Sequence, residues 1–113
     1  MAECVFCEIS SGRKPAVKVY EDDVLLAIED IHPRAPVHLL IMPKRHVPTL
    51  LDIQPDDAVW VSAVPYVANR LAREHKIADR GYRLVANVNH GGGQVIFHVH
   101  FHVMGGRHLR WPP

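Results

Sequence analysis

The chain lacks a large excess of charge of either sign. Its 113 residues contain 13 Lys and Arg against 12 Asp and Glu, a formal net charge of +1 with the histidines neutral. The basic residues are also scattered along the chain rather than clustered. Proteins that bind nucleic acid through bulk positive charge present a basic patch or stripe. We therefore expect no nucleic-acid partner of that kind.

Long hydrophobic runs are also missing. No stretch reaches the roughly 18 apolar residues that a membrane-spanning helix needs. The N-terminus, MAECVFCEIS, lacks the basic start and apolar core of a signal peptide. We therefore expect no membrane association and a cytoplasmic protein, in which the two cysteines, Cys4 and Cys7, stay reduced.

Short apolar runs predict five strands. Residues 17–30 fit two strands around the turn EDD, and residues 37–46 fit a buried third strand that ends at Pro43. Residues 82–89 and 95–104 fit the fourth and fifth, joined by the loop HGGGQ. Two of these strands join by a tight turn, and the strands do not alternate with crossover helices as a parallel sheet would require. The sequence therefore predicts an antiparallel sheet.

One segment has a helical pattern. In residues 54–76, apolar side chains recur at three- and four-residue spacing. They are Trp60, Val64, Val67 and Leu71. Pro65 lies inside this pattern and predicts a kink or a break. The expected fold is α+β, with a five-stranded antiparallel meander, one long helix packed on it, and a single domain over residues 1–113.

Histidine is the residue type present in unusual number, with nine copies. In HVHFHV, three of them, His98, His100 and His102, occupy alternate positions, so on a strand they share one face with neighbours roughly 6–7 Å apart. One metal ion accepts two such neighbours more readily than three, so the row indicates more than one role. The residues between them are expected to face the core: Val99, Phe101 and Val103.

The loop HGGGQ comes directly before the histidine row. Consecutive glycines allow backbone N–H groups to point inward and form an anion-binding concavity. This position favours a phosphate site beside the histidines over a plain flexible connection.

The sequence HVHFHVM resembles the signature of the histidine-triad (HIT) superfamily, His-φ-His-φ-His-φ-φ with φ apolar. The segments YEDDVLLAIEDIHPRAPVHLLIMPKRH, GYRLVANVNHGGGQ, HVHFHVMGGR and WPP are similar to the histidine-triad nucleotide-binding (HINT) branch, so the resemblance covers nearly the whole chain. It implies a nucleotide hydrolase or transferase that acts on the α-phosphorus of purine nucleoside 5′-phosphoramidates or acyl- or lysyl-adenylates.

The resemblance also implies catalytic roles. His100 matches the nucleophile, which would form a covalent nucleotidyl-histidine; its Nδ1 should then be held by a backbone carbonyl, leaving Nε2 free. His102 and His38 match residues that hold the phosphate oxygens and help protonate the leaving amine. Asp30 matches the carboxylate that binds the two ribose hydroxyls, which favours ribonucleotides.

Substrate-binding positions follow from the same resemblance. Asn87, Gly93 and the backbone of Val95 match the phosphate cradle, but Val95 stands where many phosphoramidases carry a serine. Because valine has no side-chain donor, the rate and the choice of leaving group depend on this position. His32 stands near the ribose site where a small polar residue is common. The apolar walls around the base match Phe6, Ile9, Ile28, Ile31 and Leu40.

The resemblance implies a homodimer whose sheet continues across the interface. The long helix and the C-terminal tail RWPP would form the contact. Trp111 would then reach the partner's site and shape leaving-group specificity.

The motif CVFC places Cys4 and Cys7 in a C-x-x-C spacing. From the residues alone it can be a redox pair, two idle thiols or half of a zinc site. The resemblance implies structural zinc, ligated by these cysteines with His46 of PKRH and His98. Four protein ligands leave no open coordination position, so such a zinc would not be catalytic.

Three other functions stay open from the sequence. A dinucleoside polyphosphate hydrolase is disfavoured by the MGGR and WPP segments. A nucleotide-binding regulatory module with low turnover is compatible with Val95. A metalloenzyme with a catalytic metal on the three histidines is disfavoured by their spacing and by the competing cysteines.

Overall fold

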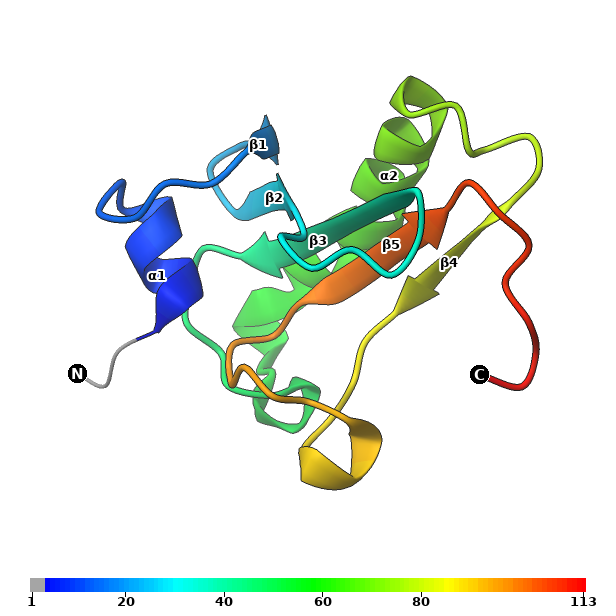
Figure 1. Ribbon diagram of the computed structural model, residues 1–113. Helices are drawn as coiled ribbons and strands as arrows, with labels where there is room; N and C mark the ends of the chain where they lie inside the picture. The colour runs from blue at the N-terminus through cyan, green and yellow to red at the C-terminus, as the bar shows by residue number, and fades with distance from the viewer. Residues whose placement is uncertain (1–3) are drawn as a thin grey trace.

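The structure is a computed structural model that describes residues 4–113. Five strands form one sheet, a long helix lies behind it in the view of Figure 1, and a short helix lies near the N-terminus. The elements are α1 (Val5–Ser10), β1 (Lys18–Glu21), β2 (Leu25–Glu29), β3 (Val37–Pro43), α2 (Ala58–Glu74), β4 (Tyr82–Val85) and β5 (Phe101–Gly105). Three short 3-10 turns lie at residues 50–52, 55–57 and 90–92.

The strand order in the sheet is β1-β2-β3-β5-β4, with every neighbouring pair antiparallel. The α+β class and the five antiparallel strands are confirmed, but the meander is wrong, because β5 inserts between β3 and β4. Val103 of β5 is fully buried, whereas no residue of β4 is fully buried and Leu84 is exposed. A strand with a buried centre gains more from two hydrogen-bonded neighbours, so the more polar β4 takes the edge.

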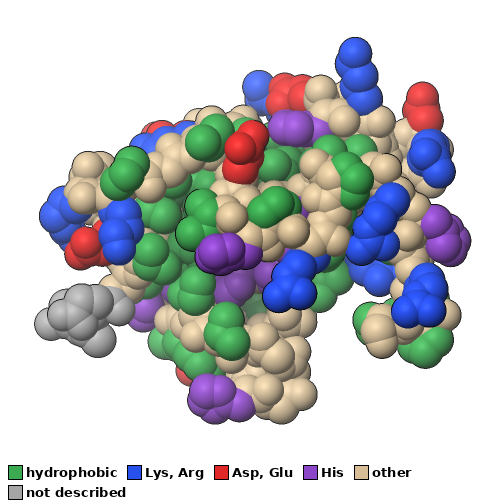
Figure 2. All heavy atoms as spheres, viewed as in Figure 1, with side chains coloured by type: hydrophobic (Ala, Val, Ile, Leu, Met, Phe, Trp, Pro, Cys, Tyr) green, Lys and Arg blue, Asp and Glu red, His purple; other side chains and the backbone are tan. Residues whose placement is uncertain are grey.

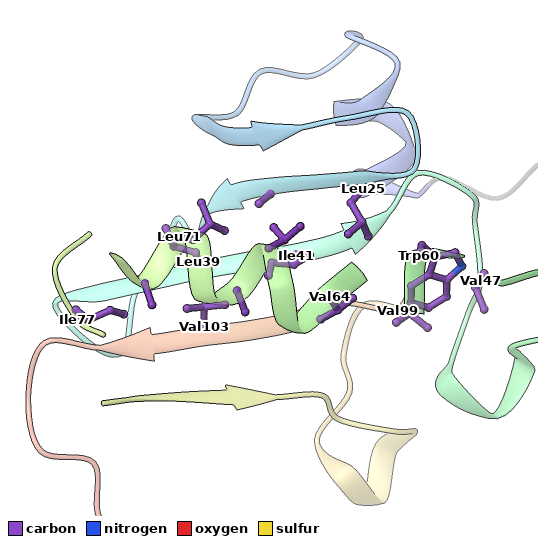
Figure 3. Close-up of a cluster of buried hydrophobic side chains, with 14 residues drawn as sticks. Leu25, Leu39, Ile41, Val47, Trp60, Val64, Leu71, Ile77, Val99 and Val103 are labelled. Atoms are coloured by element: carbon purple, nitrogen blue, oxygen red, sulfur yellow. The ribbon is translucent and has the colours of Figure 1, made fainter. Parts of the chain in front are cut away.

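Both faces of the sheet are covered. On one face, Leu25, Leu39 and Ile41 pack with Val64 and Leu71 of α2 (Figure 3). The alternate residues of β2 and β3 form a second cluster with Phe6 and Ile9 of α1: Leu26, Ile28, Leu40 and Met42. Because successive side chains of a strand point to opposite faces, α1 and α2 lie on opposite sides of the sheet. This two-sided burial explains why β2 and β3 are continuous apolar runs.

Helix α2 begins after the buried carboxylate of Asp57. Its oxygens accept from Arg45 Nε and Nη2 at 2.9 and 2.7 Å and from Trp60 Nε1 at 2.8 Å. The Arg45 guanidinium is the largest cause that holds the pKa of Asp57 well below its ordinary value. This network joins the start of α2 to the segment that follows β3.

The helix then continues unbroken through Pro65, so the predicted break is wrong. Pro65 is exposed, and the carbonyl that loses its helical partner there can bind water. The buried face of α2, which includes Val64, Ala68 and Leu71, packs on the sheet on both sides of that position and holds the helix together.

The histidine-rich segment joins the sheet later than predicted. The strand predicted at 95–104 is β5, which begins only at Phe101, and the strand predicted at 82–89 ends at Val85. Before β5, the backbone N–H of Val99 donates to Val47 O at 2.7 Å, outside the sheet. The predicted alternation still holds, since Val99 and Val103 are buried in the cluster under α2 and Phe101 packs against it. In the described part of the chain, no helix is long and apolar enough to cross a membrane.

Candidate active site and metal cluster

A cavity of about 480 Å³ lies on the face of the sheet that carries α1. Its floor follows a row of paired residues across three strands, with Ile28 opposite Leu40 and Leu40 opposite His102. Residues directly opposite one another in antiparallel strands present their side chains on the same face. Figure 2 shows this side of the molecule, with histidine side chains at its centre surrounded by hydrophobic ones. The cavity therefore has a histidine end and an apolar floor.

His100 lines the cavity and is 8% exposed. Its Nδ1 atom lies 2.8 Å from the carbonyl oxygen of His98, so Nδ1–H donates to that oxygen. The Nε2 atom of the neutral ring then carries the lone pair. The edge contact with Phe6, at 5.1 Å between ring centroids, also fixes the ring. The structure thus holds His100 in the tautomer that a nucleophilic imidazole requires.

His38 and His102 form a hydrogen-bonded chain at the histidine end of the cavity. The backbone N–H of Arg34 donates to Nδ1 of His38 at 3.0 Å, which places the proton of a neutral His38 on Nε2. That Nε2 lies 2.9 Å from Nδ1 of His102 and 3.3 Å from Oδ2 of Asp30. Nδ1 of His102 is therefore the acceptor, and the remaining proton of His102 is on Nε2.

Burial keeps both rings of this chain neutral near pH 7. It lowers the pKa of His102 to about 4, helped by the positive charge that His100 and His38 acquire when protonated. Burial also lowers the pKa of His38, and the nearby carboxylate of Asp30 opposes this effect. His102 can consequently offer Nε2–H as a neutral hydrogen-bond donor.

Asp30 follows directly after β2 and lines the cavity. Its backbone N–H donates to His38 O at 3.0 Å, and its Oδ1 accepts from the backbone N–H of His32 at 2.8 Å. These bonds hold the carboxylate beside the histidine end, where its oxygens remain acceptors for ligand hydroxyls.

The structure brings most of the sequence-predicted residues together at the cavity. Those that line it are Phe6, Ile9, Ile28, Asp30, Ile31, His32, Leu40, Val95, His100 and His102. Ile31 and Val95 are each 83% exposed. They are therefore rim residues, whereas Phe6, Ile28 and Leu40 are buried in its wall.

Four predicted residues do not line this cavity. His38 does not line it but contacts His102, which does. Asn87 and Gly93 adjoin each other, since a Cβ on Gly93 would lie 3.8 Å from Asn87 Nδ2, and Gly93 has a φ of +91° that favours glycine. Trp111 is 81% exposed in the C-terminal tail. Figure 1 draws this tail in red, running from the end of β5.

Several cavity residues were not predicted. The segment between α1 and β1 contributes Lys14, Pro15 and Ala16. Two neighbours in sequence of predicted residues also line the cavity: Val5, before Phe6, and Ile96, after Val95. The short helix α1 also escaped prediction. It begins after Cys4, whose Sγ accepts from the backbone N–H of Cys7 at 3.4 Å. A thiol as helix cap is an uncommon signal, so the sequence offered little sign of this element.

A second cluster gathers Cys4, Cys7, His46 and His98, whose ligand atoms all lie within 4.8 Å of one another. Nδ1 of His98 lies 3.2 Å from Cys4 Sγ, 3.7 Å from Cys7 Sγ and 3.2 Å from His46 Nδ1. Tetrahedral zinc with ordinary bond lengths separates such ligand atoms by about 3.3–3.8 Å. Nε2 of His98 lies 2.7 Å from Pro43 O, which orients Nδ1 toward the cluster. The donor set and its geometry therefore fit a metal ion such as zinc.

The four-ligand cluster and His100 are neighbours along the histidine row, and burial shifts the pKa values of the cluster residues. It raises the pKa of the Cys7 thiol to about 11 and lowers that of His98 to about 4 when no ion is present. His98 faces the cysteines, while His100 faces the cavity and bonds through Nδ1 to the backbone of His98. The metal cluster and the candidate nucleophile are thus adjacent but separate.

The fold and the site define an α+β domain in which a histidine with a free Nε2 lines an apolar cavity, beside a cluster of four possible metal ligands. A family model described as HIT domain matches residues 11–109. The purine nucleoside phosphoramidase of Escherichia coli strain K12 is 39% identical over 107 residues, which are 95% of this chain and 90% of that protein. The chain belongs to the HIT family.

Solved structures agree with this assignment. The crystal structure of a HIT family hydrolase from Legionella pneumophila Philadelphia 1 matches with a TM-score of 0.95 and 47% identity, over 98% of this chain and 99% of that one. A Zn-bound histidine triad family protein from Mycobacterium smegmatis matches with a TM-score of 0.80 and 37% identity, over 93% of this chain and 76% of that one.

Proposed function

We propose that this protein is a HIT-family hydrolase that acts on the α-phosphorus of purine nucleoside 5′-phosphoramidates, or of acyl- or lysyl-adenylates, through a covalent nucleotidyl-histidine. The observation that carries the proposal is the 2.8 Å contact from His100 Nδ1 to His98 O, which leaves Nε2 free beside the cavity. The 39% identity to a purine nucleoside phosphoramidase supports the substrate class.

In the first step, Nε2 of His100 forms a bond to phosphorus while the bond to the leaving group breaks; the nitrogen of a phosphoramidate takes up a proton from solvent water, whereas an adenylate releases a carboxylate. In the second step, a water oxygen joins phosphorus, the bond to His100 breaks, and the water yields a proton. One water is consumed for each phosphoramidate, and His100 returns with Nε2 free. His102, supported by His38, is placed to donate Nε2–H to the negatively charged phosphoryl oxygens and to take part in the proton transfers.

The remaining predicted residues would bind the nucleotide. Asp30 would accept hydrogen bonds from the ribose hydroxyls, and His32 lies next to it on the rim. Asn87, Gly93 and the backbone of Val95 would complete the phosphate cradle. The base would lie over the apolar part of the cavity, which is formed by Phe6, Ile9, Ile28, Ile31 and Leu40.

A single-turnover reaction with adenosine 5′-phosphoramidate tests the proposal. Mass spectrometry of the acid-quenched wild type should detect adenylylated protein, and the His100→Ala variant should form none while still binding AMP. His108→Ala is the matched control, because His108 is an exposed tail residue outside the cavity. A His100→Ala variant that turns over at the wild-type rate would exclude this nucleophile.

A nucleotide-binding module with low turnover is the second candidate. It is favoured by Val95, which lies at the rim of the cavity and has no side-chain donor for a leaving nitrogen. In the same experiment, wild type that binds AMP but never becomes adenylylated would select this candidate.

We also propose that the cluster of Cys4, Cys7, His46 and His98 holds a structural Zn²⁺. The four protein ligands would close the coordination shell, so the ion would join α1 to the segments after β3 and before β5. It would supply no chemistry to the substrate. Its expected effect is to stabilise the N-terminal wall of the cavity.

A homodimer is the proposed assembly. β4 is an edge strand of the sheet, where Leu84 is 37% exposed, and α2 exposes Val59 and Tyr66 at 66% and 78%. Pairing of two β4 edges would extend the sheet and cover these side chains, and would bring the exposed Trp111 of each tail toward the partner. Light scattering after size exclusion measures the mass; a monomer at micromolar concentration would contradict the assembly.

A further inference from the structure

Lys14 lines the substrate cavity from the segment between α1 and β1. It is the only Lys or Arg among the described residues that line this cavity. Its backbone N–H and that of Arg13 both donate to Glu8 O, at 3.1 and 2.9 Å, so the loop is tied to α1. The side chain is exposed and forms no ion pair with a described carboxylate, whereas neighbouring Arg13 lies 3.7 Å from Glu8. The Lys14 ammonium is thus available to a ligand.

The position of Lys14 along the cavity follows from the register of the sheet. His102, Leu40, Ile28 and Lys18 lie opposite one another on β5, β3, β2 and β1 in that order. Neighbouring strands lie about 4.8 Å apart, so the β1 end of this row is roughly 14 Å from His102. Lys14 lines the cavity and lies four residues before Lys18, the first residue of β1, so the chain connection places it nearer to that end than to His102. The histidines and Lys14 therefore occupy opposite ends of the apolar floor.

We propose that Lys14 selects the base of the nucleotide, favouring purines with a carbonyl at position 6, guanine and hypoxanthine, over adenine. The inference rests on the proposed function, in which the phosphate lies at the histidine end. A nucleotide held there by its phosphate and by Asp30 lays its base over Leu40 and Ile28 and directs the far edge of the base to Lys14.

The selection has a simple chemical basis. An ammonium group is a donor only. The edge of guanine that carries O6 and N7 presents two acceptors, whereas the same edge of adenine presents the N7 acceptor and an N6 amino donor. Lys14 can donate to the first edge at both atoms, but it faces a donor on the second. Specificity therefore arises from an attraction to the oxopurine and a mismatch with the aminopurine.

Two carboxylates line the cavity, Asp30 and Glu29. Asp30 lies at the histidine end, 3.3 Å from His38. Glu29 pairs with Leu39, which packs under α2, so its side chain leaves the sheet on the face opposite Ile28 and the cavity floor. An acceptor that would favour the amino group of adenine is therefore absent from the Lys14 end among the described residues that line the cavity.

Calorimetric binding of three nucleotides tests the inference without any turnover. Inosine 5′-monophosphate and AMP differ at position 6 and N1, and GMP adds an amino group at position 2. Wild type should bind IMP and GMP about five to ten times more tightly than AMP, the size expected for one partly exposed charge-assisted hydrogen bond. In Lys14→Met, the ratio should fall to within about twofold, mainly through weaker IMP and GMP binding.

Lys18→Met is the matched control, because it removes the same charge from an exposed residue that does not line the cavity. Lys18→Met should keep the wild-type ratio of IMP and GMP affinity to AMP affinity. This result would show that the preference comes from a local contact of Lys14 and not from the general positive potential of a nearby cation. Equal binding of all three nucleotides to wild type, or an unchanged ratio in Lys14→Met, would overturn the role of Lys14 while leaving the proposed function intact. Wild type that binds none of the three would instead overturn the proposed function.

Discussion

Nε2 of His38 lies 2.9 Å from Nδ1 of His102, and this contact connects the cavity to the backbone of Arg34. Because the Arg34 N–H fixes the proton of His38 on Nε2, the orientation of one backbone amide determines which nitrogen of His102 carries its proton. His38 itself does not line the main cavity. We therefore expect His38 to act on the proposed reaction through His102, as a positioning residue.

The first prediction concerns His38→Ala. Loss of the ring removes the donor that holds His102 in its tautomer. The kcat for a phosphoramidate should therefore fall by about 100-fold, which is the lower end of the rate contribution of a well-positioned proton-transfer group. KM should change by less than about threefold, because Asp30 and the apolar floor still bind the nucleotide. Steady-state kinetics measure both constants, with His108→Ala as the control. A raised KM with an unchanged kcat would show that His38 acts in ground-state binding instead.

The second prediction concerns stability against pH. Burial lowers the pKa of folded His102 from an ordinary value of 6.5 to about 4. As pH falls, the unfolded chain therefore takes up a proton before the folded one does, and stability should decline between about pH 6.5 and about pH 4 and then level off. His102→Asn keeps an acceptor for His38 but does not titrate in this range.

Urea unfolding of wild type and His102→Asn near pH 7 and near pH 4.5 measures this linkage. The fall in midpoint between the two conditions should be smaller for the variant, since all other titrating groups are shared. An equal fall in both proteins would mean that His102 is not buried in its neutral form.

The third prediction concerns the metal. Purified wild type should contain about one zinc per chain, and Cys4→Ser should retain little, because three remaining ligands leave the tetrahedral site incomplete. Thermal unfolding should occur at a lower temperature in Cys4→Ser, and a chelator should destabilise wild type but not the variant. Ser10→Ala, outside the cluster, serves as the control. Activity that disappears on chelation in protein that remains folded would indicate a catalytic metal instead.

The sequence predicted the centre of the fold better than its edges. β2 and β3 were recognisable because Leu25–Glu29 and Val37–Pro43 are buried on both faces, which requires continuous apolar runs. The sheet order was not recognisable, because β4 and β5 pair with each other both in a meander and in the observed order. What decides the order is that β5 carries the fully buried Val103 and pairs on both sides.

The histidine row was predicted in its side-chain alternation but not in its backbone. His98 and His100 precede β5, in a segment tied to Val47 rather than to the sheet. Such a contact joins residues 52 positions apart and leaves no local sequence signal. Lys14 was missed for a different reason, since an exposed lysine in a loop normally has no partner. Its significance depends on how α1 folds back over β2 and β3.

The last prediction concerns Val95, which is 83% exposed on the rim of the cavity that contains His100. Its side chain cannot donate to or accept from a leaving nitrogen, whereas a serine hydroxyl can do both. Val95→Ser should therefore raise kcat/KM for adenosine 5′-phosphoramidate, whose leaving group is ammonia, by about tenfold. Val95→Ala is the matched control, because it shortens the side chain without adding a hydroxyl.

The comparison separates hydrogen bonding from steric access. If the hydroxyl is the missing group, Val95→Ser gains activity, Val95→Ala does not, and the affinity for AMP stays the same in both, since AMP has no leaving nitrogen. If the valine only restricts access to His100, both variants should gain equally. No gain in either variant would show that the exposed valine has no part in the departure of the amine, and the rate would then depend on the phosphate cradle and on the His38–His102 chain.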